Sequence, residues 1–209
     1  MMPTFKARCT GQLAGDMVPD ALLAELRFMA RFLKQAIPRT LVAKDTRPPL
    51  LIFTDAALEG GDKVATVGAV MIDNSEAGTC RRFFGKKLNE QELAKFQTQS
   101  MKVITALEVL PVLVAARQWA DRCLHRRVFY YVDNDGARFS LINMSSSSEV
   151  IQGILKELAL HFAAKPSFPW YARVPSSSNV ADLPSRLEFA WLKENGFSQV
   201  NPSLKFWTS

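Results

Sequence analysis

Acidic residues stand at four places in this chain where a buried charge would be costly unless a positive charge lay beside it. Two of them, Asp55 and Asp133, each end an apolar run that is typical of a buried strand. Glu108 interrupts an apolar stretch with helical character, and Asp182 lies in a polar passage rich in Pro and Ser. Divalent metal ions would offset such charges. The pattern therefore indicates an enzyme that uses metal-bound carboxylates.

Two of these residues also have ordinary structural explanations. Asp residues commonly begin turns after a strand or cap a helix, and this applies to Asp55 and, more strongly, to Asp182. For the third aspartate the competitor is Asp135, which falls past the predicted strand, where it would serve as an N-cap or first-turn residue. We prefer Asp133.

Glu108 is the only charged residue between Lys102 and Arg117. Its helical neighbours four residues before and three residues after are Ile104 and Pro111, so its side chain need not face water. A solvated glutamate is therefore a weaker explanation here than in most helices.

Hydrophobic periodicity and turn residues predict the elements that would position these carboxylates. The predicted strands are 50–55, 64–73, 79–87, 127–133 and 168–174. The predicted helices are 21–37, 90–99, 101–124, 135–143 and 149–164. Three hairpin-linked strands followed by strands that alternate with helices predict an α/β fold. Its mixed sheet would have five strands, three antiparallel and then parallel, flanked by helices.

Residues 1–49 form a predicted N-terminal helical extension that precedes the α/β domain. Its helix is predicted to begin after Asp20 as the N-cap and to end before Pro38. The extension ends in a proline-rich linker, the α/β domain spans 50–186, and 187–209 is a C-terminal tail rich in aromatic residues. Those aromatic residues would pack either on the domain or on a separate partner.

The net charge of +6 favours polyanionic partners such as nucleic acid. The three cysteines lack the spacing of a zinc site or a disulfide framework. The chain has no long apolar stretch for a membrane span and no apolar core of a signal peptide. We therefore expect an intracellular protein, in cytoplasm or nucleus, with no membrane partner.

Several stretches resemble the ribonuclease H domain of retroelement reverse transcriptases. They are IFTDAA at 52–57, VATVGAVMID at 64–73, ALEVLPVLVAARQW at 106–119, YYVDNDGARFSLI at 130–142 and WYARVPSSSNVADLPSR at 170–186. The resemblance covers about 50–186, and residues 1–49 are similar to the connecting region that precedes such nuclease domains. It implies a ribonuclease H-like fold and an endonuclease that cleaves the RNA strand of RNA–DNA hybrids.

The resemblance also implies the site. The metal-binding and catalytic carboxylates fall on Asp55, Glu108, Asp133 and Asp182, which would hold two Mg²⁺ ions, with Mn²⁺ as a substitute. Asp55 would bridge the ions, with Glu108 and Asp133 on one and Asp182 on the other. Without metal, we expect raised pKa values among these carboxyls.

Contacts to the nucleic acid are expected from polar and basic residues near these carboxylates. The candidates are Asn134, Arg138, Arg173, Arg186 and Lys63. One feature departs from many cellular members of the family, which carry a mobile histidine shortly before the last carboxylate. Residues 175–178 fill that region here, while His161 lies too far upstream.

Two alternatives remain open. An integrase-like or resolvase-like nuclease shares acidic two-metal chemistry but acts on DNA. A catalytically silent domain would bind nucleic acid or brace the polymerase part of a reverse transcriptase, although it would have no need of four costly carboxylates.

Overall fold

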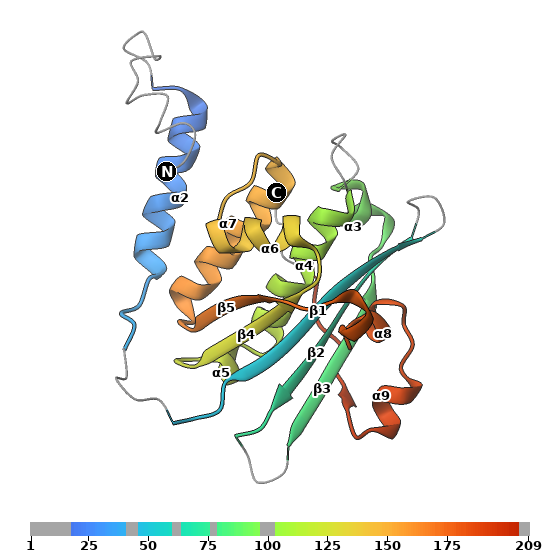
Figure 1. The fold of residues 1–209 in the computed structure, drawn as a ribbon. Coiled ribbons are helices and arrows are strands. Elements are labelled where there is room, and N and C mark those ends of the chain that lie inside the picture. Colours follow the sequence, from blue (N-terminus) through green and yellow to red (C-terminus); the bar gives the residue numbers. More distant parts are fainter. Residues whose placement is uncertain (1–17, 41–45, 60–63, 76–78, 97–102, 205–209) are drawn as a thin grey trace.

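The computed structural model describes residues 18–40, 46–59, 64–75, 79–96 and 103–204. At its centre lies a six-stranded sheet in the order β5-β4-β1-β2-β3-β6 (Figure 1). The strands are β1 (Leu50–Glu59), β2 (Val64–Asp73), β3 (Cys80–Lys87), β4 (Arg127–Val132), β5 (Phe168–Arg173) and β6 (Ser198–Gln199). The longer helices are α2 (Asp20–Gln35), α4 (Val103–Gln118), α6 (Asp135–Asn143) and α7 (Glu149–Ala164). The short ones are α3 (Glu90–Ala94), α5 (Ala120–Cys123), η1 (Ser176–Ser178), α8 (Asp182–Ser185) and α9 (Ala190–Glu194).

The strand directions confirm the predicted α/β class with a ribonuclease H-like sheet. Strands β1, β2 and β3 pair antiparallel, while β4 pairs parallel with β1, and β5 pairs parallel with β4. The prediction of five strands omitted β6, a two-residue strand that pairs parallel with β3. So short a strand carries no periodic signal, since the alternation of side chains needs several residues to be visible.

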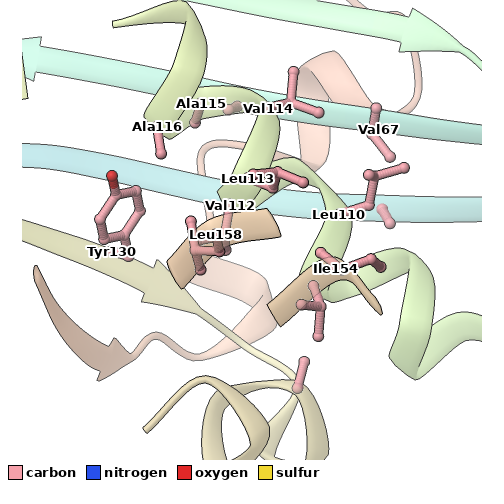
Figure 2. Packing of buried hydrophobic residues seen from close by; sticks show 14 of the residues in the cluster. Val67, Leu110, Val112, Leu113, Val114, Ala115, Ala116, Tyr130, Ile154 and Leu158 are labelled. Carbon is pink, nitrogen blue, oxygen red and sulfur yellow. The ribbon is translucent and has the colours of Figure 1, made fainter. Parts of the chain in front are cut away.

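Helix α4 forms the centre of the main core. Every residue from 106 to 116 is buried, including Glu108, because the helix lies between the sheet and α7. Figure 2 shows α4 side chains such as Leu110 and Leu113 among Val67 and Tyr130 of the sheet and Ile154 of α7. A helix that is apolar on all sides must be buried on all sides, which explains why its polar interruption ends up inside the protein.

Several predicted boundaries differ from the structure, and the helix predicted at 90–99 ends at Ala94. The strand predicted to end at Asp55 continues to Glu59, because β1 stays paired with β2 through Glu59. The helix predicted at 101–124 breaks at Trp119, whose backbone leaves the helical region at φ −115° and ψ 28°. Asp20 is the first residue of α2 and makes no capping bond, since the N-cap position is Pro19. Residues 97–102 lie outside the described residues.

The N-terminal helix and the described part of the tail both pack on the rest of the chain. Helix α2 lies along α7, held by the hydrogen bond from Ile37 N to Ala163 O (2.9 Å) and the Lys156–Glu25 ion pair (2.5 Å). In the tail, Leu192 and Phe197 are buried against the sheet. The sequence left open whether the tail packs on the domain or on a separate partner, and these two residues pack on the domain. None of the described helices has the length and apolar character needed to traverse a membrane.

Candidate metal centre

Three acidic side chains from three separate elements meet at one point. The carboxylates of Asp55, Glu108 and Asp133 each offer an oxygen atom, and these oxygens all lie within 4.8 Å of one another. Asp55 comes from β1, Glu108 from α4, and Asp133 directly follows β4. The sequence predicted this group, and the structure places these three members together.

The meeting point is a consequence of the different lengths of β1 and β4. Their pairing ends at Phe53 and Tyr131, and β4 itself ends at Val132, whereas β1 continues to Glu59. Beyond Phe53 the edge of β1 on this side therefore has no strand beside it. Asp55 lies in that gap, and Glu108 reaches it from the helical layer. A mid-strand aspartate can thus be a ligand because the neighbouring strand stops.

Burial dominates the electrostatics of the group. It is the main cause that raises the pKa of Glu108 to about 9, and the charges of Asp55 and Asp133 raise it further. Burial also raises the pKa of Asp55 to about 7, although the hydrogen bond from Ser185 opposes this shift. These raised values agree with the expectation for a metal-free carboxylate cluster.

A cation would fit this donor set. The Oε2 atom of Glu108 is buried and has no hydrogen-bond partner among the described residues. A buried carboxylate oxygen without a donor is costly, and a divalent cation bound by oxygen ligands would remove that cost. Three carboxylate oxygens form a set of hard ligands, which suits Mg²⁺ or Mn²⁺ better than zinc.

Asp182 lies outside the three-carboxylate group. It is half-buried at the start of α8, and its Oδ1 accepts a hydrogen bond from Arg186 Nε at 2.9 Å. It is nevertheless near enough that its charge raises the pKa of Asp55. Asp182 is therefore a neighbour of the centre that is engaged by an arginine four residues later.

Two residues that the sequence analysis did not single out contact Asp55 directly. Ser185 is fully buried, and its hydroxyl donates to Oδ2 of Asp55. Asn179 is buried as well, and its Nδ2 donates to Thr54 O at 3.0 Å and approaches Asp55 Oδ1 at 3.5 Å. Both stand three residues from Asp182, one before and one after, so a turn around Asp182 brings both toward β1. That symmetric spacing is the signal that could have identified them.

The close approach of α8 to the sheet depends on two glycines. A Cβ atom at Gly68 would lie 2.8 Å from Ser185 Cα, and one at Gly85 would lie 2.7 Å from Phe189 Cε1, both too close for carbon atoms. Thr66 adds a hydrogen bond from its hydroxyl to the Ser185 carbonyl. The absence of side chains at these glycines therefore leaves room for α8 to bring Ser185 to Asp55.

The candidate nucleic-acid contacts have intramolecular partners here. Asn134 is the N-cap of α6 and accepts from Ala137 N at 3.0 Å. Asp135 pairs with both Arg138 (2.9 Å) and Arg173 (3.5 Å). In this structure Asp135 therefore organises basic side chains beside the centre, and Lys63 lies outside the described residues.

Neither histidine belongs to the acidic cluster. His161 lies in α7, where burial is the main cause that lowers its pKa to about 4. His125 precedes β4 with a left-handed backbone, φ 51°. The region before Asp182 is instead the exposed serine turn η1.

No family model matches this chain, and no curated protein matches it. Solved structures do. Ribonuclease H1 from the halophilic archaeon Halobacterium salinarum NRC-1 is similar at 14% identity and a TM-score of 0.46, covering 68% of this chain and 98% of that chain. The N-terminal RNase H domain of Rv2228c from Mycobacterium tuberculosis is similar at 12% identity and a TM-score of 0.47, covering 70% and 97%.

A third similar structure is the LC11 ribonuclease H1 in complex with an RNA/DNA hybrid, at 14% identity and a TM-score of 0.43. It covers 64% of this chain and 91% of that chain.

Proposed function

We infer that this chain is a divalent-metal-dependent nuclease of the ribonuclease H type that cleaves the RNA strand of RNA–DNA hybrids. The observation that carries this proposal is the convergence of Asp55, Glu108 and Asp133 within 4.8 Å at the open edge of β1. A buried carboxylate oxygen without a hydrogen-bond donor, such as Glu108 Oε2, has a chemical purpose if metal binds there. The substrate class follows the sequence resemblance.

In this proposal Asp55, Glu108 and Asp133 would hold Mg²⁺, or Mn²⁺ in its place. Asp182 would contribute to a second ion, which requires that it exchange its bond to Arg186 for the metal. When bound, the ions lower the pKa of a water molecule and stabilise the charge on the departing oxygen.

The other residues prepare this chemistry. Ser185 and Asn179 orient Asp55 from the α8 side, and the apolar surroundings of Glu108 keep bulk water away from its carboxylate. Arg173 and Arg186 are about half-exposed and would contact phosphates beside the centre. Recognition through 2′-hydroxyls and backbone shape would need little reading of base sequence.

Cleavage of a labelled RNA–DNA hybrid with Mg²⁺ tests the proposal, beside matched duplex DNA and duplex RNA. Wild type is expected to cut only the RNA of the hybrid, and Asp55→Asn is expected to abolish cutting while leaving the fold intact. Asp121→Asn is the matched control, because this carboxylate is 93% exposed and outside the centre.

Other results would favour other functions. Near-normal turnover by Asp55→Asn would contradict the site. Preferential cutting of duplex DNA would favour an integrase-like or resolvase-like nuclease. If no substrate were cut, a nucleic-acid-binding or polymerase-bracing domain would be the better explanation.

The proposal extends to the nuclease part of a retroelement reverse transcriptase. Its support is the sequence resemblance of 50–186 and of the preceding segment, whose helix α2 packs on α7. Affinity capture of the endogenous protein followed by a DNA-synthesis assay tests it. Polymerase activity in the same polypeptide is the expected result, and its absence would contradict this extension alone.

A further inference from the structure

A row of aromatic side chains lies on one face of the sheet. The register pairs Phe53 with Tyr131 and Phe129 with Trp170, so all four side chains emerge on the same face. The rings of Phe53 and Tyr131 stack at 4.5 Å between centroids with 12° between planes, and Phe129 lies 6.5 Å from Tyr131. We name Phe53, Phe129, Tyr131 and Trp170 the aromatic platform.

The platform is open to solvent. Trp170 is 65% exposed, and the other three are only partly buried. Alternate residues of β4, such as Val128 and Tyr130, are buried in the main core on the opposite face. Helix α8 contacts β1, β2 and β3 on the platform face, where Phe53 packs against the cluster that contains Leu192 and Phe197, so the platform is bordered there and is most exposed at Trp170 of β5. An open sheet face with this many aromatic rings is a surface suited to a partner.

The platform is continuous with the carboxylate centre. Side chains alternate along a strand, so Phe53 points to the same face as Asp55, and Asp133 directly follows β4, two residues after Tyr131. Two residues of strand correspond to about 7 Å. That is roughly the rise of two stacked nucleotides at about 3.4 Å each. A nucleic-acid strand bound at the carboxylate centre would therefore reach the platform with its next nucleotides.

The charges around the platform suit a polyanion. Neither β4 (RVFYYV) nor β5 (FPWYAR) contains Asp or Glu, and Arg127, two residues before Phe129, emerges on the platform face. On the same face a hollow of about 340 Å³ continues beyond Phe53 and is lined in part by Arg81 and Trp191. Aromatic rings with arginines around them are the combination that binds single strands, because bases stack and phosphates are neutralised.

We propose that the aromatic platform binds unpaired nucleotides of the nucleic acid whose neighbouring segment occupies the carboxylate centre. Bases stack on Trp170 and on Phe129 beside the Tyr131–Phe53 pair, while Arg127 lies beside the backbone. This proposal rests on the proposed nuclease function for the identity of the substrate. Binding itself is measurable without cleavage.

Fluorescence anisotropy of labelled oligo-dT and oligo-rU, measured with the whole chain in EDTA, tests the platform and distinguishes DNA from RNA. Trp170→Ala and Phe129→Ala are each expected to weaken binding roughly five- to hundredfold, the loss expected for one base stack. Trp170→Tyr is expected to retain most of the affinity. The matched control is Phe139→Ala, which removes a 53% exposed aromatic ring from α6, outside the platform.

A second measurement links the platform to cleavage. Wild type is expected to cleave a hybrid with a single-stranded extension at a lower KM than a blunt hybrid, and Trp170→Ala is expected to lose this difference with kcat unchanged. Oligonucleotide binding without any cleavage would overturn the nuclease function and leave the platform supported. Binding that Trp170→Ala leaves intact, or that Phe139→Ala weakens equally, would overturn the platform and point to a protein-contact surface.

Discussion

The hydroxyl of Ser185 donates a hydrogen bond to Oδ2 of Asp55, a residue 130 positions earlier in the chain. Together with Asn179 this bond fixes the carboxylate from the side opposite to Glu108. The turn around Asp182 is therefore part of the centre, even though Asp182 itself lies outside the three-carboxylate group.

We expect Ser185→Ala to reduce cleavage roughly tenfold or more, because a hydrogen bond to a charged group contributes about 1.5–3 kcal/mol. Loss of orientation should raise the Mg²⁺ concentration required for half-maximal rate. The measurement is the rate against Mg²⁺ concentration. Ser177→Ala is the control, since that serine is exposed in η1. An unchanged Mg²⁺ requirement in Ser185→Ala would show that this bond does not position the ligand.

The stability of the metal-free protein should decrease as pH rises. Glu108 has a pKa of about 9 in the folded protein against an ordinary value of 4.5, and Asp55 about 7 against 3.8. The folded state holds these protons more tightly than the unfolded state. The stabilisation that this gives is therefore complete below about pH 4 and is lost as pH rises through 7 and 9. Thermal unfolding in EDTA from pH 4 to 9 measures this.

Glu108→Gln should flatten that pH dependence, because the amide does not ionise. We expect the variant to be more stable than wild type in EDTA at pH 8 while being inactive. Glu194→Gln changes an exposed glutamate and should follow wild type. If Glu108→Gln kept the full pH dependence, the titration would have to come from other groups.

Added Mg²⁺ should stabilise wild type by mass action. At about one hundred times Kd the gain is about 2.7 kcal/mol. For a chain of this size that corresponds to an increase in Tm of roughly 5–10 °C. Asp55→Asn should show little of this shift, as followed by calorimetry, whereas Asp121→Asn should behave as wild type. Equal shifts in all three proteins would mean that the ion binds elsewhere.

Gly68→Ala should push α8 away from the sheet, since the new methyl would meet the backbone of Pro184 and Ser185 at 2.8 Å. We expect a loss of about 1–3 kcal/mol in the free energy of unfolding. Cleavage should fall by an order of magnitude or more, because small displacements of a ligand are costly to catalysis. Denaturant unfolding and cleavage rates measure both effects.

Gly196→Ala provides the comparison. Gly196 has φ +78°, so an alanine there is strained, yet nothing lies within 4 Å of the added methyl. This variant should lose stability and keep its rate. Equal losses of rate in both variants would mean that the defect in Gly68→Ala is one of folding and not of the position of Ser185.

The order of elements and the three convergent carboxylates were predictable because their signals are local. The apolar runs before Asp55 and Asp133 mark strands, and the uninterrupted apolar surroundings of Glu108 mark a buried helix. A run of residues carries this information regardless of what packs on it, since periodicity of 2 or 3.6 depends only on backbone geometry.

The remaining features depend on contacts between distant segments, and only the tertiary structure decided them. Asp55 faces an open edge because β4 stops at Val132, a fact about the neighbouring strand and not about β1. Ser185 reaches Asp55 because Gly68 leaves room for the backbone of α8. Such complementarity between segments that are distant in the sequence leaves no periodic signal in either segment, so it appears only when the sheet is assembled.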